Sequence, residues 1–320
     1  MNYKNIDHIL THCGSLKKSE SLVILCDKTT KDLGESFRGQ AIKITPQAEL
    51  IEMPLADKHG QEPPGNVRER MLKANLVISL CKYSLAHSKA RMDAASQGAR
   101  FLSMPFYSWE LLNDPSVAFD FKSQAPVVNK VADAFTKGSK LNVTTRKGTD
   151  IVMDIKGRKG NYCPGFVSQA GELGSPPDIE ANISPLETNS NGVLVIDGSI
   201  TCSEIGLLKE TVKLTIKDGS IQKIESENND YVETLNQIFE KPGSKHRILA
   251  ECGVGLNPLA KLSGVMLTDE GALGAVHFGF GSNYTVGGKN EIDFHLDFVV
   301  TKATLKIDDE FILKDGELVI

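Results

Sequence analysis

The sequence predicts an α/β domain followed by a β-rich α+β domain. The first, over residues 1–125, is expected to be a doubly wound parallel sheet, and the second, over residues 126–320, a mixed, mainly antiparallel β domain. Near-continuous apolar segments alternate with helix-like segments in the first part, which is typical of parallel strands covered on both faces. Turn dipeptides separate alternating segments in the second part, which is typical of hairpins. A chain of 320 residues is long enough for two domains.

Four apolar segments are expected as the strands of the N-terminal domain. They are Ser21–Cys26, Glu49–Met53, Leu76–Leu80 and Arg100–Met104. Helices are expected at Asn2–Leu16, Thr30–Ile42, Val67–Lys73 and Ser84–Gln97. The first strand is not followed by the glycine pattern of dinucleotide-binding folds, so the sequence does not support a dinucleotide site.

The C-terminal domain is marked by its turns. Strong turn signals occur at Lys147–Asp150, Asp197-Gly198, Asp218-Gly219 and Asp315-Gly316. Two helices are expected within this part, at Asn129–Lys137 and Asp230–Glu240. This domain is therefore expected to be β-rich with few helices.

Composition excludes several classes of function. Hydrophobic content is 40%, charged content is 24% and the net charge is −5, so neither nucleic acid nor an anionic membrane is an expected partner. The N-terminus is polar and no apolar run reaches 18 residues, which predicts a cytoplasmic protein. The six cysteines form no C-x-x-C pair, so we expect free thiols rather than a cysteine-based zinc site.

Candidate metal ligands gather in the last quarter of the chain. Glu291–Val300 alternates and ends in apolar residues, which predicts a strand with His295 and Asp297 on one face. An imidazole and a carboxylate so placed form half of a metal site. His277 lies 18 residues upstream, and Glu251 precedes a glycine-rich segment further upstream. Three sources of ligands are thus available.

With these motifs, the chain resembles the metallo-aminopeptidases typified by aminopeptidase T and aminopeptidase S. The segment Asn290–Phe298 is similar to the last His-x-Asp pair of that family, and His277 is followed seven residues later by a tyrosine. Glu251 matches the second glutamate of the family and Glu180, five residues before a proline, matches the first. The resemblance implies five metal ligands, namely Glu180, Glu251, His277, His295 and Asp297, with Tyr284 and Glu180 as catalytic residues.

The resemblance implies a hydrolase, a metal-dependent aminopeptidase that removes N-terminal residues from small peptides as a homodimer. Two divalent ions, zinc, cobalt or manganese, would activate a water molecule, and Tyr284 would donate a hydrogen bond to the developing oxyanion. Which carboxylate bridges the ions is left open. Glu270 either supports a ligand or is an ordinary loop acid.

Two other functions remain open. The same fold resembles ring-cleaving dihydroxypyridine dioxygenases, which hold a single Fe(II) with two histidines and an aspartate, here His277, His295 and Asp297. The presence of both glutamates favours the hydrolase. A non-catalytic binding relative is the third alternative, because Ser282 and Ile292 depart from the aminopeptidase pattern. The number and identity of bound metal ions separate the first two.

Overall fold

The computed structural model describes residues 3–239 and 243–320, which divide into two compact units. Unit 1 runs to Ser123 and also includes Cys163–Pro177, and unit 2 comprises Gln124–Tyr162 and Asp178–Ile320. The segment 163–177, expected in the C-terminal domain, belongs to unit 1 because β8 (Leu173–Gly174) pairs in parallel with β4 (Arg100–Ser103). The predicted combination of a parallel α/β domain and a mainly antiparallel β domain is confirmed.

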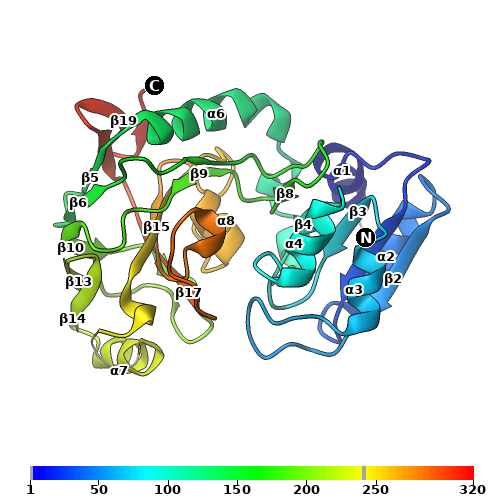
Figure 1. Ribbon diagram of the computed structural model, residues 1–320, viewed down its shortest axis with the longest axis horizontal. Coiled ribbons are helices and arrows are strands. Elements are labelled where there is room, and N and C mark those ends of the chain that lie inside the picture. Colours follow the sequence, from blue (N-terminus) through cyan, green and yellow to red (C-terminus); the bar gives the residue numbers. More distant parts are fainter. Residues whose placement is uncertain (1–2, 240–242) are drawn as a thin grey trace. The chain divides into compact units, whose positions relative to one another are not determined.

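Unit 1 is built on a parallel sheet with the order β2-β1-β3-β4-β8 (Figure 1). The remaining strands are β1 (Leu22–Cys26), β2 (Ala48–Glu52) and β3 (Leu76–Ser79). The helical elements are α1 (Lys4–His8), the π-helical η1 (Ile9–Cys13), α2 (Lys31–Ala41), α3 (Gly65–Met71), α4 (Lys89–Ser96), α5 (Trp109–Leu112) and η2 (Pro115–Ala118). Every residue of β1, β3 and β4 is buried, which explains why these strands read as continuous apolar runs.

Two predicted helices of unit 1 differ from the observed ones by more than two residues at one end. The fourth begins at Lys89 rather than Ser84, because Ser88 is extended and its hydroxyl caps the amide of Arg91. The first covers residues 4–13 as α1 and η1, and Asn2 lies outside the described residues.

Unit 2 contains two sheets that are built from antiparallel strand pairs, such as β10 with β13 in one and β15 with β16 in the other. The eight-stranded sheet has the order β14-β13-β10-β6-β5-β18-β19-β20, and the seven-stranded sheet has the order β12-β11-β17-β16-β15-β9-β7. The first sheet comprises β5 (Lys140–Thr144), β6 (Asp150–Asp154), β10 (Ser190–Ile196), β13 (Val212–Lys217), β14 (Ser220–Ser226), β18 (Thr304–Ile307), β19 (Glu310–Lys314) and β20 (Glu317–Leu318). The second comprises β7 (Asn161–Cys163), β9 (Glu180–Ile183), β11 (Ser199–Ile200), β12 (Gly206–Leu207), β15 (Leu249–Gly255), β16 (Val276–Gly281) and β17 (His295–Val300).

The helices of unit 2 are few. They are α6 (Phe121–Lys137), whose first three residues belong to unit 1, α7 (Asn229–Ile238) and α8 (Met266–Gly271), with the short η3 (Lys245–Arg247) and η4 (Tyr284–Val286). The end of the predicted helix at Glu240 lies outside the described residues. Within the described part of the chain, no helix combines the length and apolar character needed to cross a membrane.

Three of the four predicted turns join paired strands of one sheet, and the fourth connects the two sheets. Asp218-Gly219 joins β13 to β14 and Asp315-Gly316 joins β19 to β20, with positive φ at both residues of each pair, as a tight hairpin requires. Residues 145–149 join the paired strands β5 and β6. Asp197-Gly198 instead carries the chain from β10 in one sheet to β11 in the other.

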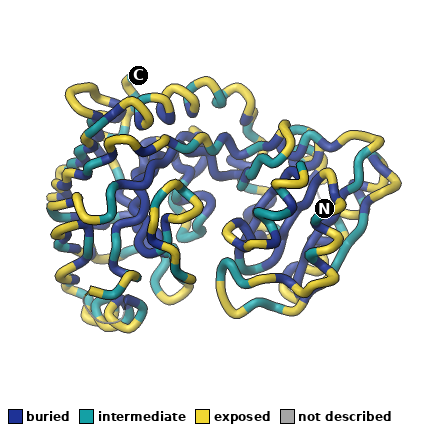
Figure 2. The backbone as a smooth tube through the Cα atoms, viewed as in Figure 1, coloured by how far each residue is buried: buried dark blue, intermediate teal, exposed yellow. Residues whose placement is uncertain are grey.

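The seven-stranded sheet is the inner one of unit 2. Residues alternate between buried and more exposed along β13, whereas β9, β15 and β16 are buried at every position (Figure 2). One face of β16 and β17 carries Phe280 and Phe298, which pack with Phe239 at centroid distances of 5.4–5.9 Å. Because side chains alternate along a strand, His277 and Asp297 project from the opposite face.

Candidate metal centre

Four adjacent strands of the inner sheet supply the predicted metal ligands. Glu180 comes from β9, Glu251 from β15, His277 from β16, and His295 and Asp297 from β17. The register places Glu251 opposite Gly279, and Gly279 opposite Asp297, in one row across three strands. The structure therefore brings together residues that are up to 117 positions apart in the sequence.

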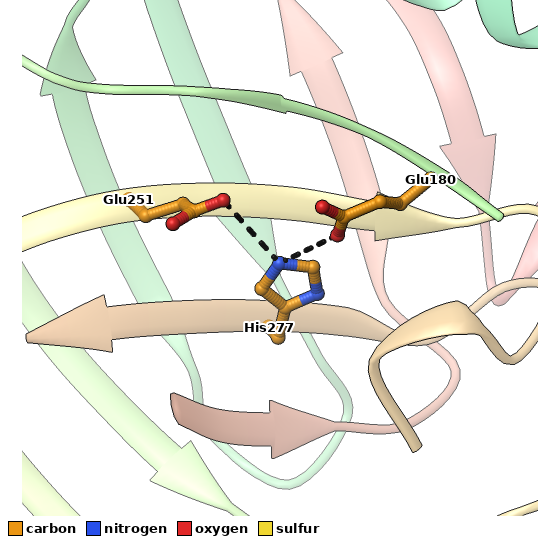
Figure 3. Close-up of side chains that lie close together, drawn as sticks. All are labelled: Glu180, Glu251 and His277. Atoms are coloured by element: carbon orange, nitrogen blue, oxygen red, sulfur yellow. Dashed lines mark ion pairs between the residues drawn. The ribbon is translucent and has the colours of Figure 1, made fainter. Parts of the chain in front are cut away.

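The five side chains form two overlapping groups that share Glu251. The ligand atoms of Glu180, Glu251 and His277 lie within 4.8 Å of one another, as do those of Glu251, His295 and Asp297. Figure 3 shows the His277 ring pointing at both glutamates, with its Nε2 3.0 Å from Glu180 Oε2 and 3.9 Å from Glu251 Oε1. The other oxygen of Glu251 lies 3.4 Å from His295 Nε2, so this carboxylate reaches both imidazoles.

The tautomer of His295 follows from its hydrogen bonds. Its Nδ1 lies 2.8 Å from the carbonyl oxygen of Ser282, which can only accept, so Nδ1 carries a proton. Its Nε2 lies 3.1 Å from Asp297 Oδ1 and presents its lone pair to the cluster in the neutral ring. A backbone carbonyl that fixes the remote ring nitrogen is the usual support of a metal-binding histidine. The Nδ1 of His277 is buried and has no hydrogen-bond partner among the described residues.

Glycines make the space in which the two imidazoles lie. A Cβ at Gly253 would lie 2.1 Å from Cε1 and Nε2 of His277, and a Cβ at Gly279 would lie 2.6 Å from His295 Nε2. Gly253 faces His277 across β15 and β16 in the register. The role of Gly253 becomes visible only when the two strands are paired.

Two further acids lie close enough to influence the cluster. Burial and the nearby charge of Glu180 raise the pKa of Asp178 well above its usual value. Burial and the nearby charge of Asp297 raise the pKa of Glu270 in the same way. Oδ1 of Asp178 and Oε1 of Glu270 are buried without a hydrogen-bond partner in the described part of the chain. Glu270, which the sequence left as either a supporting residue or a loop acid, is therefore part of the electrostatic surroundings of the site.

The histidines respond to this excess of acids. Burial alone would lower the pKa of His277, but Glu180, Glu251 and Glu270 raise it well above its ordinary value. Burial opposes the same change in His295, where Asp297 and Glu251 raise the pKa to about 10. Burial raises the pKa of Glu251. Five buried or partly buried acids thus face only two imidazoles, a balance that a bound divalent cation would correct.

The donor set fits a metal ion. Imidazole and carboxylate ligands suit iron, zinc, cobalt and manganese, and two histidines with one carboxylate is the arrangement of non-heme Fe(II) sites. Tyr284, predicted to be catalytic, lies in η4 on the segment between β16 and β17 and is 53% exposed. Its proposed role therefore stays a prediction. Asn182 was missed, although its position two residues after Glu180 on a strand places both side chains on one face.

Comparison with known proteins identifies the family. The family model described as NicX: 2,5-dihydroxypyridine 5,6-dioxygenase matches residues 5–320. The solved 2,5-dihydroxypyridine dioxygenase from Pseudomonas putida KT2440 is similar in structure, with a TM-score of 0.80 and 20% identity over 99% of this chain and 96% of that one. AmpT from Thermus thermophilus is also similar, with a TM-score of 0.73 and 16% identity over 99% of this chain and 98% of that one. No curated protein matches the chain.

These findings correct the predicted activity. The likeness to AmpT supports the shared fold, which is the part of the aminopeptidase resemblance that holds. The expected metallo-aminopeptidase, and with it the hydrolase class, is wrong, because the family model that covers nearly the whole chain describes a dioxygenase. The ligand motif misled the interpretation because the retained glutamates were read as evidence for hydrolysis. The chain belongs to the NicX family of 2,5-dihydroxypyridine 5,6-dioxygenases.

Proposed function

We propose that the protein is an Fe(II)-dependent dioxygenase that cleaves the ring of a dihydroxypyridine. The observation that carries this proposal is the family match over residues 5–320. The site supports it, because two imidazoles and several carboxylates converge on one face of the inner sheet. This set contains the two histidines and one carboxylate that a mononuclear Fe(II) site requires.

His277, His295 and Asp297 would hold the iron. The bound metal would supply the redox chemistry by which dioxygen and the aromatic ring react. Glu180, whose Oε2 lies 3.0 Å from His277 Nε2, would add a further carboxylate ligand to the metal ion. The chain itself would orient the substrate, with the carboxylate of Glu251 accepting hydrogen bonds from its hydroxyl groups. We expect one iron per chain, and a measured ratio of two ions per chain would contradict a mononuclear site.

Oxygen uptake tests this function. Protein loaded anaerobically with Fe(II) and mixed with 2,5-dihydroxypyridine in oxygenated buffer should consume oxygen as the absorbance of the ring disappears. Asp297→Asn should abolish uptake, whereas Asp309→Asn, which alters an exposed carboxylate in the turn between β18 and β19, should leave it unchanged. Absence of uptake by iron-loaded, folded protein across mono- and dihydroxylated pyridines would refute the proposal.

We further propose that the substrate is a small molecule, that the protein acts as a homodimer and that it is cytoplasmic. The acidic net charge of −5 supports a partner other than nucleic acid. Light scattering on the purified protein would test the dimer, since a mass near that of one chain would contradict it.

A further inference from the structure

Two asparagine side chains form a chain of hydrogen bonds that ends at Glu180 of the metal centre. Asn182 Nδ2 donates to Glu180 Oε1 at 2.7 Å, and Asn161 Nδ2 donates to Asn182 Oδ1 at 2.7 Å. Asn161 Nδ2 also donates to the carbonyl oxygen of Val286 at 3.0 Å. Asn182 is only 3% exposed. These contacts connect β9, the adjacent edge strand β7 and η4.

The groups at the two ends of this hydrogen-bond chain fix the orientation of both side-chain amides. The carbonyl oxygen of Val286 can only accept a hydrogen bond, so the amide nitrogen of Asn161 must face it. The same nitrogen then donates to Asn182, whose oxygen must face Asn161 and whose nitrogen must face Glu180. A flip of either amide would set two acceptors or two donors against each other, at the cost of a buried hydrogen bond.

The Val286 end of the hydrogen-bond chain is itself held in place. The guanidinium group of Arg158 donates to the carbonyl oxygen of Gly287, next to Val286, and pairs with Glu187 at 2.6 Å. Glu187 also accepts from Asn283 Nδ2 at 3.0 Å. The backbone of η4 is therefore anchored from both sides, and the Val286 carbonyl is a fixed reference point for the amides.

The Asn182 bond decides which oxygen of Glu180 is available. Because Oε1 is engaged by Asn182, Oε2 faces the cluster and lies 3.0 Å from His277 Nε2. We infer that Asn182 and Asn161 are positioning residues that present Glu180 to the metal centre through Oε2 alone. This inference rests on the metal-dependent function proposed above and assigns no direct contact with substrate to either asparagine.

Metal affinity, measured without turnover, tests the inference. Co²⁺ titrations followed by the visible absorption of the bound ion should show affinity about tenfold to a hundredfold lower in Asn182→Ala, the usual effect of removing a residue that supports a ligand. Asn161→Ala should lower affinity in the same direction, because it acts through Asn182. In the double variant, Asn161→Ala should add almost nothing to the loss from Asn182→Ala, since residues in one hydrogen-bond chain are not additive.

Asn142→Ala is the matched control. Asn142 lies in β5 of the same unit and donates to the backbone carbonyl of Ile151 at 3.0 Å, away from the cluster. It should bind Co²⁺ as the unaltered protein does, and thermal unfolding of the metal-free variants would separate loss of fold from loss of positioning. Equal affinity in Asn182→Ala and the unaltered protein, or strictly additive losses in the double variant, would overturn the inference. A protein that binds Co²⁺ in this pattern but consumes no oxygen would instead refute the proposed function alone.

Discussion

Gly253→Ala adds one methyl group to the strand beside His277. No positive φ is recorded at Gly253, so alanine fits the backbone and the perturbation is confined to contacts of the new Cβ. That atom would lie 2.1 Å from both Cε1 and Nε2 of the imidazole. The effect of the substitution should therefore be felt first at the ring that faces Glu180 and Glu251.

The size of the displacement follows from the contact distances. Moving the ring from 2.1 Å to an ordinary contact of 3.4 Å requires a shift of about 1.3 Å. Metal–ligand distances tolerate about 0.2 Å, so His277 would be lost as a ligand. We expect affinity for Fe(II) to fall by more than about 100-fold, which exceeds the usual effect of a supporting residue.

Two further glycine variants calibrate the measurement. Gly279→Ala places its Cβ 2.6 Å from His295 Nε2 and 2.9 Å from Asp297 Oδ1, so the required shift of about 0.8 Å also exceeds the tolerance of about 0.2 Å, and a comparable loss of affinity is expected. Gly39→Ala in α2 meets no atom within 4 Å and should keep full affinity while gaining about 0.5–1 kcal/mol of stability.

Anaerobic Fe(II) titration monitored by calorimetry is the appropriate assay. Gly253→Ala and Gly279→Ala should both lose affinity for Fe(II), whereas Gly39→Ala should bind it as the unaltered protein does. Unchanged Fe(II) affinity in a folded Gly253→Ala protein would refute the assignment of His277 as a ligand.

Three other predictions concern stability. Phe298→Ala removes one of three mutually packed rings behind the site and should lower the free energy of unfolding by about 3–5 kcal/mol in urea titrations, and a loss below about 1 kcal/mol would contradict this packing role. Glu20 accepts hydrogen bonds from Arg100, whose side chain is only 8% exposed, and these bonds lower the pKa of Glu20. The stability that this pair adds to the fold is present above pH 4.5 and is lost as the pH falls through the lower pKa of the folded state. Glu20→Gln should therefore lower the free energy of unfolding by about 3 kcal/mol at pH 7 and flatten the acid side of the profile of stability against pH. Without a bound cation, burial favours a lower pKa for His295, but Asp297 and Glu251 outweigh it and raise this pKa from 6.5 to about 10. The stability that protonated His295 contributes is present below pH 6.5 and should be lost as the pH rises toward 10. Melting curves should show that saturating Zn²⁺ suppresses this loss.

The fold was predictable where one residue type dominates a segment. The apolar runs at Leu22–Cys26 and Leu76–Ser79 could only be buried strands, and Asp218-Gly219 required a tight turn. The return of Leu173–Gly174 to the parallel sheet was not predictable, because two residues are too few to carry a periodic signal. The strand expected from Glu291 begins at His295, because Asn290 and Phe294 instead hydrogen-bond to the segment after β16.

The candidate site was predictable in its side chains but not in its surroundings. The alternation of side chains along a strand placed His295 beside Asp297, and the resemblance to the aminopeptidases supplied the distant Glu180. Neither observation predicts the strand pairing that puts Gly253 against His277. The activity was not predictable from ligands alone, since the same carboxylates and imidazoles suit both hydrolysis and oxygen chemistry. The family match over residues 5–320 argues against hydrolysis and favours oxygen chemistry.

Labelling with ¹⁸O₂ tests the central claim most directly. Iron-loaded protein supplied with 2,5-dihydroxypyridine and ¹⁸O₂ in ordinary water should yield a ring-opened product that carries both labelled atoms, as mass spectrometry would show. A ring-opened product whose new oxygen atoms come only from water, or an intact ring after prolonged incubation, would contradict the account.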